Sequence, residues 1–225
     1  MKIGAIVQAR MSSDRLPGKV LKNVAGKPLL QYILERLRKC STFHQIIVAT
    51  SDNRTDDPIA EYCRKNNTVC FRGPLQNVAK RFYMVLEENN LDAFVRVCGD
   101  SPMLDQKLID QGVKLFKKGY DLVTNILPRT FPSGQCVEVV NTKTFKNSFG
   151  SFITPDELEH VTQYFYSNPD QFKFYNFSSG GDYKNVLLVV DTEEDLDHFK
   201  KIIYRMEKPH WEYGWQDIVK LLSCN

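Results

Sequence analysis

Short β-branched runs alternate with amphipathic helical stretches along the first half of this 225-residue chain, and this alternation restricts the possible folds most. The predicted strands are apolar on both faces, as strands buried between two layers of helices are. They lie at residues 2–8, 46–50, 68–71, 94–98 and 121–124. Strand and helix in regular order predict an α/β fold, with a doubly wound, mostly parallel, Rossmann-like sheet covered on both faces.

The alternation changes after about residue 127. The predicted elements that follow are a strand at 135–141, a helix at 154–167 and a strand at 172–177. We expect residues 127–185 to form a small inserted β/α subregion that lies over the main sheet as a lid. A buried strand is predicted again at 186–190. Because no repeat, linker or low-complexity run interrupts the chain, we expect a single domain over residues 1–225.

Charge and composition exclude several classes of protein. The 30 basic and 27 acidic side chains give a formal net charge of +3, too small for a broad field that attracts nucleic acid or an anionic membrane. An apolar content of 42% with 25% charged residues excludes a membrane-spanning class. The cysteines, which lack any C-x-x-C spacing typical of zinc or redox sites, are Cys40, Cys63, Cys70, Cys98, Cys136 and Cys224. Scattered free thiols and the lack of a signal peptide predict a cytoplasmic protein. The small net charge predicts that it binds neither nucleic acid nor membrane.

The loop after the first predicted strand has the composition of a polyphosphate-binding loop. It reads Ala9-Arg10-Met11-Ser12-Ser13-Asp14-Arg15-Leu16-Pro17-Gly18-Lys19. Ligands of doubly wound sheets bind beyond the carboxyl ends of the strands, where cations supply countercharge and hydroxyls and backbone N–H groups donate hydrogen bonds. Each cation alone is more typical of a solvated surface, but three of them in this loop favour phosphate binding. The loop is not a Walker A motif, since Ser13 and Val20 stand where that motif requires Gly and Ser or Thr.

Two aspartates follow predicted buried strands in the same way. Asp100 comes after the strand at 94–98, and Asp191 comes directly after the strand at 186–190. Each one alone is also typical of a turn brace or a helix cap. Two carboxylates at strand ends, with a cationic loop at a third, favour a Mg²⁺ site over a triphosphate, because Mg²⁺ prefers oxygen ligands.

A series of motifs resembles one protein family along essentially the whole chain. In order they are Q-A-R-M-S-S-D-R-L-P-G-K-V-L, A-G-K-P-L-L, A-T-S-D, F-R-G, R-F-Y, V-C-G-D-S-P, V-E-V, L-E-H-V-T and V-D-T-E-E-D-L. The set is similar to the cytidylyltransferases that activate acidic sugars, the acylneuraminate and 3-deoxy-manno-octulosonate enzymes, and most closely to their SpsF-like spore-coat polysaccharide branch. The resemblance implies a GT-A-like nucleotidyltransferase form of the predicted fold.

The resemblance also implies roles for individual residues. Nucleotide-binding positions would be Ala9, Arg10, Ser12, Arg15, Lys19, Ser51, Asp52 and Arg72, the last three near the ribose or cytosine. Asp100 and Asp191 would hold Mg²⁺, and the catalytic residues would be Arg10, Lys19 and Asp100. The acceptor pocket would contain Glu138, Glu159 and His160, although a histidine at that place is also typical of a helix surface. Gln135 and Cys136 replace the Leu-Asp that relatives commonly have, which leaves the acceptor open.

The reaction implied is transfer of CMP from CTP to a hydroxyl of a sugar or sugar-acid acceptor, with release of pyrophosphate, for surface polysaccharide synthesis. A glycosyltransferase of the same sheet architecture is an alternative, but such enzymes usually carry two aspartates around one residue, and this chain has Asp100-Ser101-Pro102. A catalytically silent nucleotide-binding domain is another. The number of metal ions and the use of a general base stay open.

Aromatic residues gather near the end of the chain at Trp211, Tyr213 and Trp215. Exposed aromatic clusters mark protein interfaces. We therefore expect this cluster to be core packing or a self-association surface rather than a ligand platform, and the protein to be a homodimer.

Overall fold

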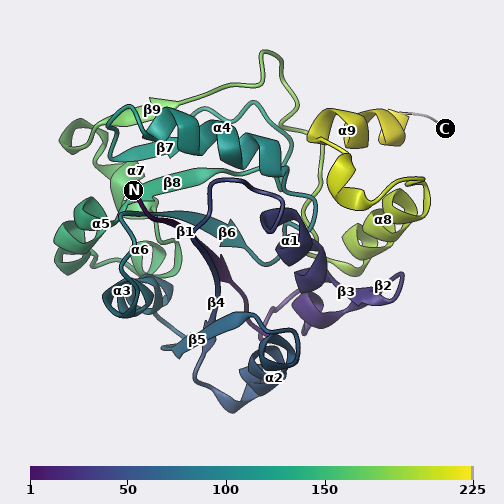
Figure 1. Ribbon diagram of the computed structural model, residues 1–225, viewed down its shortest axis with the longest axis horizontal. Helices are drawn as coiled ribbons and strands as arrows, with labels where there is room; N and C mark the ends of the chain where they lie inside the picture. The colour runs from purple at the N-terminus through teal and green to yellow at the C-terminus, as the bar shows by residue number, and fades with distance from the viewer. Residues whose placement is uncertain (224–225) are drawn as a thin grey trace.

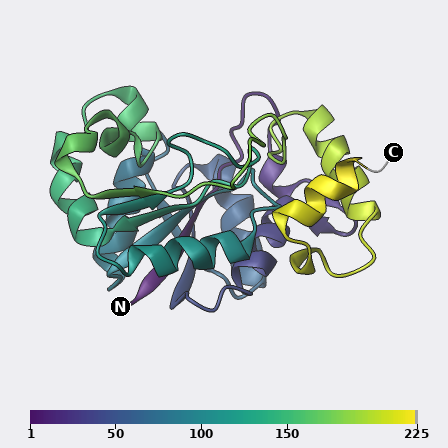
Figure 2. The ribbon, with the colours of Figure 1, turned by 90° about the horizontal axis from the view of Figure 1, so that it is seen from above.

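The computed structural model describes residues 1–223, and a seven-stranded sheet with helices on both faces forms its centre (Figures 1 and 2). The strands of this sheet are β1 (Ile3–Gln8), β4 (Gln45–Ser51), β5 (Val69–Gly73), β6 (Ala93–Cys98), β7 (Leu122–Thr124), β8 (Glu138–Asn141) and β9 (Phe174–Asn176), while β2 (Asn23–Val24) and β3 (Lys27–Pro28) form a separate ribbon. The spatial order is β5-β4-β1-β6-β8-β7-β9. The predicted α/β sheet is confirmed.

The order of the strands places a topological switch point in the middle of the sheet. β1 pairs in parallel with β4 on one side and with β6 on the other, and β5 extends the β4 side in parallel. The chain therefore runs outward from β1 to β4 and β5 and then returns across to β6. The loops that leave β1 and β6 diverge at this point and leave a crevice at the carboxyl ends of the strands.

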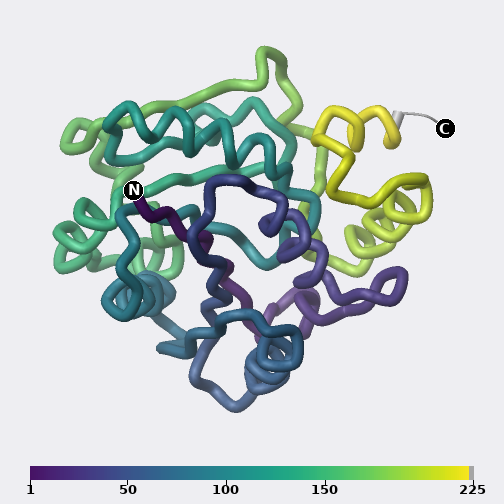
Figure 3. The backbone as a smooth tube through the Cα atoms, in the orientation of Figure 1, coloured from purple at the N-terminus to yellow at the C-terminus, as the bar shows by residue number. Residues whose placement is uncertain are grey.

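Nine α-helices in the described part of the chain cover the sheet and its edge. They are α1 (Leu29–Leu37), α2 (Asp57–Lys65), α3 (Val78–Glu88), α4 (Gln106–Phe116), α5 (Thr142–Ser148), α6 (Pro155–Glu159), α7 (Gln163–Ser167), α8 (Glu193–Tyr204) and α9 (Trp215–Ser223). Alternate residues of β1 point to opposite faces: Ala5 and Val7 pack with α1, α2 and α4, whereas Ile6 packs with α3, α5 and α7. This two-sided burial explains the continuous apolar runs of the central strands. The trace in Figure 3 ends with α8 and α9, which pack beside α1 and the β2–β3 ribbon.

The block at 127–185 does not form a separate small sheet, so that expectation is wrong. β8 joins the main sheet antiparallel to both β6 and β7, and β9 continues it in parallel with β7. β8 needs this place because Val139 belongs to the core on one face and Val140 to the core on the other. The helix predicted at 154–167 is broken into α6 and α7, since His160 has φ −101° and ψ 87°, outside the helical region.

The strand predicted at 186–190 is also absent from the described residues. The segment makes a single isolated bridge, between Ser133 and Leu187, and Val190 N donates to Asp100 O at 2.8 Å. Leu188 and Val190 are buried against α8, whereas Leu187 is 52% exposed. The hydrophobic pattern thus reflects side-chain packing of an irregular segment. This segment places Asp191 next to Asp100.

The aromatic residues near the C-terminus do not all form a surface. Trp215 is 6% exposed and packs edge-on against Phe131 and Tyr183, so it belongs to the core rather than to a surface. Trp211 is half-buried beneath the ammonium group of Lys39, 4.9 Å from the ring centre.

Within residues 1–223 no helix combines the length and apolarity needed to cross a bilayer. Of the cysteines, Cys224 lies outside the described residues, and those described are free.

Candidate active site

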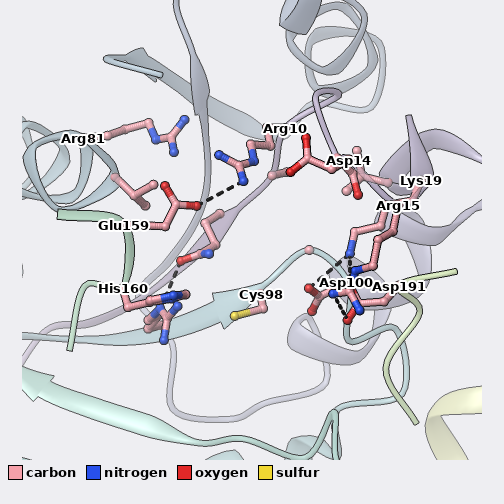
Figure 4. Close-up of a pocket in the computed structure, with 17 residues that line it drawn as sticks. Arg10, Asp14, Arg15, Lys19, Arg81, Cys98, Asp100, Glu159, His160 and Asp191 are labelled. Carbon is pink, nitrogen blue, oxygen red and sulfur yellow. Dashed lines mark hydrogen bonds and ion pairs between the residues drawn. The ribbon is translucent and has the colours of Figure 1, made fainter. Parts of the chain in front are cut away.

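A pocket of about 550 Å³ opens at the switch point between β1 and β6 (Figure 4). Its wall comes from the loop after β1, from α3, from the ends of β6 and α6, and from the segment that precedes α8. Arg10, Lys19, Asp100 and Asp191 all line it, so these predicted site residues do meet. Strand-end loops far apart in the sequence build one site, as expected for a doubly wound sheet.

One end of the pocket is a cluster of two carboxylates and two cations. Lys19 Nζ lies 2.6 Å from Asp191 Oδ1 and 3.3 Å from Asp100 Oδ2. Arg15 Nη2 contacts the other oxygen of Asp191 at 2.8 Å. The Lys19 side chain is only 11% exposed, which makes these contacts stronger than ion pairs in open solvent.

Two glycines bring this cluster together. Gly18 has φ +70°, a left-handed conformation that lets the loop enter the short 3₁₀ helix Lys19–Leu21. Gly99 lies where a Cβ atom would stand 2.8 Å from the carbonyl oxygen of Gln8. Only glycine therefore allows the end of β6 to pass so close to the end of β1 and present Asp100 to the pocket.

A buried carboxylate that sequence patterns did not single out holds the loop after β1 in place. Asp56 is fully buried, and its Oδ1 accepts a hydrogen bond from Met11 N at 2.7 Å. Its Oδ2 accepts from the backbone N–H and the hydroxyl of Ser51, at the end of β4. Asp56 therefore ties the residue after Arg10 to the sheet.

The opposite end of the pocket is formed by arginines and by α6. Arg10 Nη2 lies 3.2 Å from Glu159 Oε1, so the loop after β1 contacts the last residue of α6. Arg81, on α3, also lines this end and is 1% exposed. Its burial lowers its pKa, although the charges of Asp56 and Glu159 oppose that shift. The R-F-Y motif was the only sequence signal for Arg81.

The three predicted acceptor residues have different positions. Glu159 and His160 line the pocket, whereas Glu138 is buried outside its wall. Glu138 Oε2 accepts from Arg96 Nη1 at 2.8 Å, and Oε1 accepts from the hydroxyl of Thr162. Burial opposes ionisation of Glu138, but Arg96 and these hydrogen bonds outweigh it and lower the pKa of the carboxyl. Glu138 thus fixes Arg96, which does line the pocket.

Four predicted nucleotide-binding residues are not in the wall of the pocket. They are Ser12, Ser51, Asp52 and Arg72. Ser12 is exposed while Ser13 lines the pocket, and Ser51 is buried against Asp56. Arg72 donates to the carbonyl oxygens of Ser51 and Asn53, both at 2.9 Å, and pairs with Asp57 at 2.7 Å. Its guanidinium therefore shapes the turn after β4.

Further features of the pocket limit which nucleophile and which metal site it can provide. Burial raises the pKa of Cys98 to about 12, so this thiol is a poor nucleophile. Among residues 1–223 no group of three or more His, Cys, Asp or Glu side chains could hold a metal ion alone. Asp100 and Asp191 nevertheless face a single point, since both contact Lys19 Nζ. Two carboxylates fit a Mg²⁺ ion whose remaining ligands are phosphate oxygens and water.

The crevice lies at the switch point and combines a cationic loop with paired carboxylates. This combination is typical of a protein that binds a nucleotide. Residues 4–214 match the protein family described as cytidylyltransferase, and the chain belongs to this family. It is similar to the spore coat polysaccharide biosynthesis protein SpsF of Bacillus subtilis strain 168, 33% identical over 98% of this chain and 93% of that protein. It is also similar to a 3-deoxy-manno-octulosonate cytidylyltransferase of Geotalea daltonii, 30% identical over 73% of this chain and 58% of that one.

A solved structure agrees with this assignment. The cytidylyltransferase of Leptospira borgpetersenii serovar Hardjo-bovis has a TM-score of 0.94 and 30% identity, covering 99% of this chain and 94% of that one. The family resemblance drawn from the motifs is confirmed, and so is the nucleotidyltransferase form of the α/β fold.

Proposed function

We propose that this protein transfers CMP from CTP to a hydroxyl group of a sugar-acid acceptor, with release of pyrophosphate, in the synthesis of a surface polysaccharide. The observation that carries the proposal is the convergence of Lys19, Asp100 and Asp191 at one end of the crevice. The family supports CTP as the donor. SpsF and the 3-deoxy-manno-octulosonate enzyme, named for a coat polysaccharide and a sugar acid, support the acceptor class.

The site favours in-line displacement at the α-phosphorus of CTP. The acceptor oxygen forms a bond to this phosphorus as the bond to the pyrophosphate oxygen breaks, and the hydroxyl proton leaves to solvent. Such a reaction needs positioning and charge neutralisation more than covalent chemistry. Arg10, Arg15 and Lys19 line the pocket where they would bind the phosphates and balance the charge on departing pyrophosphate.

The paired aspartates would hold the metal. Mg²⁺ bound there would lower the pKa of the acceptor hydroxyl and neutralise phosphate charge. In the structure Arg15 helps to balance Asp191, and Lys19 contacts both carboxylates. Its flexible side chain can turn from the carboxylates to phosphate oxygens when a triphosphate enters.

The β6 side of the pocket suits a carboxylated acceptor. Arg96 Nε donates to Gln8 Oε1 at 3.0 Å, and its Nη1 binds Glu138. Held from two sides, the guanidinium presents a fixed cation to the pocket. Arginine in a fixed orientation is well suited to bind a planar carboxylate.

The compartment and assembly belong to the same proposal. We propose that the protein acts in the cytoplasm, where CTP is available and free thiols persist. We also propose a homodimer, which half-buried Trp211 and Tyr213 support as part of a contact surface. Light scattering on the purified protein measures the assembly directly.

Pyrophosphate release tests the reaction. The protein is incubated with each of the four nucleoside triphosphates, with or without Mg²⁺, and with a panel of sugar acids, amino sugars and alditol phosphates. We expect release only with CTP, Mg²⁺ and a sugar acid, and a loss of at least about 100-fold in Asp100→Ala. Asp110→Ala, a change on α4 outside the pocket, is the matched control. CTP binding without turnover on any acceptor would instead indicate a silent domain, and cleavage of a nucleotide sugar a glycosyltransferase.

A further inference from the structure

We propose that Arg81 and Glu159 select the base of the nucleotide: Arg81 donates hydrogen bonds to O2 and N3 of cytosine, and Glu159 accepts one from its 4-amino group. This inference rests on the proposed function, which supplies CTP as the substrate. It adds the two residues that make the site specific for a cytidine nucleotide.

Arg81 is a buried cation, and two of its nitrogens have no hydrogen-bond partner among the described residues. Its side chain is 1% exposed, and neither Nε nor Nη1 has a partner within residues 1–223. A buried charged donor without an acceptor is costly, so such a group usually marks a place that a ligand completes. Arg81 lines the pocket, and in Figure 4 its guanidinium points toward Arg10 and Glu159.

The position of Arg81 in the fold places it on the nucleoside side of the crevice. A Cβ atom built on Gly73, at the end of β5, would lie 3.4 Å from Arg81 Cγ, so Arg81 sits at the carboxyl end of the β4–β5 half of the sheet. Asp100 and Arg96 belong to the β6 half. A triphosphate held by the loop after β1 lies between these halves, with the acceptor on the β6 side. Its nucleoside therefore extends toward Arg81.

Arg72 was predicted to have this role, but it is already engaged. Its Nε and Nη2 donate to backbone carbonyls of the turn after β4, and it pairs with Asp57. Arg72 does not line the pocket, whereas Arg81 does. Of the two guanidinium groups, Arg81 is the one available to a ligand.

Cytosine matches the pair formed by Arg81 and Glu159. Its hydrogen-bonding edge presents two adjacent acceptors, O2 and N3, followed by an amino donor. The parallel N–H groups of a guanidinium fit the acceptors, and a carboxylate fits the donor. Uracil presents an N3–H donor to Arg81 and the O4 acceptor to Glu159, so both contacts become repulsive.

The neighbouring carboxylate also favours a ligand that carries a hydrogen-bond donor. Glu159 lies 3.2 Å from Arg10, and α6, which carries it, packs against α3, which carries Arg81. A phosphate or an acceptor carboxylate bound to Arg81 would offer Glu159 only acceptor oxygens. A base that carries both acceptors and a donor satisfies both side chains.

Equilibrium binding of three probes tests the proposal. CTP, UTP and inorganic tripolyphosphate are titrated into the wild-type protein and the variants Glu159→Gln and Arg81→Lys by calorimetry, without acceptor. We expect the wild type to bind CTP at least about tenfold more tightly than UTP. Both variants should lose most of that preference while tripolyphosphate binds no more weakly. Arg38→Lys, an exposed arginine on the far end of α1, should keep it.

The possible outcomes separate this inference from the proposed function. An unchanged ratio of CTP to UTP affinity in Glu159→Gln and Arg81→Lys overturns the assignment to the base. Equal loss of all three probes in Arg81→Lys places Arg81 on the phosphates and overturns it too. If Arg81→Lys does not fold, as circular dichroism would show, Glu159→Gln decides alone because its side chain is 33% exposed. A wild type that binds none of the probes refutes the proposed function as well.

Discussion

The ammonium nitrogen of Lys19 lies 2.6 Å from Oδ1 of Asp191, although 172 residues separate them in the chain. The same nitrogen lies 3.3 Å from Asp100, so one cation holds two carboxylates that would otherwise repel each other. The three residues come from the loop after β1, the end of β6 and the irregular segment before α8. This contact closes one end of the crevice and leads to the first prediction.

Replacing Lys19 with methionine should remove most activity. Methionine keeps much of the side-chain volume but removes the ammonium group that Asp100 and Asp191 share. The same ammonium group is one of the cations that would bind the phosphates. We expect kcat/KM for CTP to fall by at least about 100-fold, measured as pyrophosphate release. Lys22→Met is the matched control, because Lys22 pairs with Glu193 at the exposed surface. Equal losses in the two variants would contradict a role for Lys19 in the site.

Replacing Asp56 with asparagine should loosen the phosphate-binding loop. The amide has the same shape, but one of its two acceptor positions becomes a donor that faces Met11 N or Ser51 N. We expect a loss of about 1–3 kcal/mol in the free energy of unfolding, measured in urea. The KM for CTP should also rise several-fold, with a smaller change in kcat. Asp57→Asn breaks only an exposed ion pair with Arg72 and should cost less than about 1 kcal/mol.

An alanine at Gly99 should disturb both stability and the position of Asp100. Its Cβ atom would lie 2.8 Å from the backbone oxygen of Gln8, which cannot move without shifting β1. We expect a destabilisation of about 1–3 kcal/mol in thermal or urea unfolding, together with reduced turnover. Gly150 has open space around the same atom, so Gly150→Ala should stay within about 0.5 kcal/mol of the wild type. A neutral Gly99→Ala would mean that β1 and β6 can separate freely.

The stability of the protein should fall in mild acid because of His210. Burial lowers the pKa of His210 from 6.5 to about 4, although its contact with Glu35 opposes the shift. Its Nδ1 is buried and has no partner within residues 1–223, so a proton there would meet no acceptor in that part of the chain. Between pH 6.5 and about 4 the unfolded chain binds the proton more readily, so stability rises with pH in this window and is constant above it.

Urea unfolding at pH 7.5 and pH 5 measures this effect. We expect the free energy of unfolding to be lower at pH 5 by on the order of 1–2 kcal/mol. Glu35, whose pKa is lowered below 4.5 by hydrogen bonds that outweigh its burial, adds a loss only at lower pH. His210→Phe keeps an aromatic ring against Tyr32 and should shrink the difference between the two pH values. A difference of the same size in that variant would assign the acid sensitivity to other groups.

The central strands could be predicted from the sequence because their signal is local. The predicted runs at 2–8 and 94–98 differ from β1 and β6 by one residue at one end, and the run at 46–50 differs from β4 by one residue at each end. Continuous apolar residues require burial on two faces, and only a sheet between helices supplies it. A run such as 186–190 has the same pattern, yet only Leu188 and Val190 are buried, against α8, and the segment makes one isolated bridge in place of a strand. Hydrophobicity predicts burial, and strand pairing depends on where the rest of the chain lies.

What the sequence alone determined is the family, the α/β class and the chemistry of the crevice: a cationic loop after the first strand and aspartates at 100 and 191 that the fold brings together. Tertiary structure decided which side chains of the same type reach the ligand. Arg72 and Arg81 are both guanidinium groups near the end of β5, but backbone carbonyls and Asp57 engage the first, while burial without partners leaves the second to the pocket. Tertiary structure also decided the roles of two buried carboxylates: Asp56 binds the backbone N–H of Met11, and Glu138 binds the guanidinium of Arg96. The physical reason is that the direction of a polar side chain depends on partners distant in sequence, which no local pattern contains.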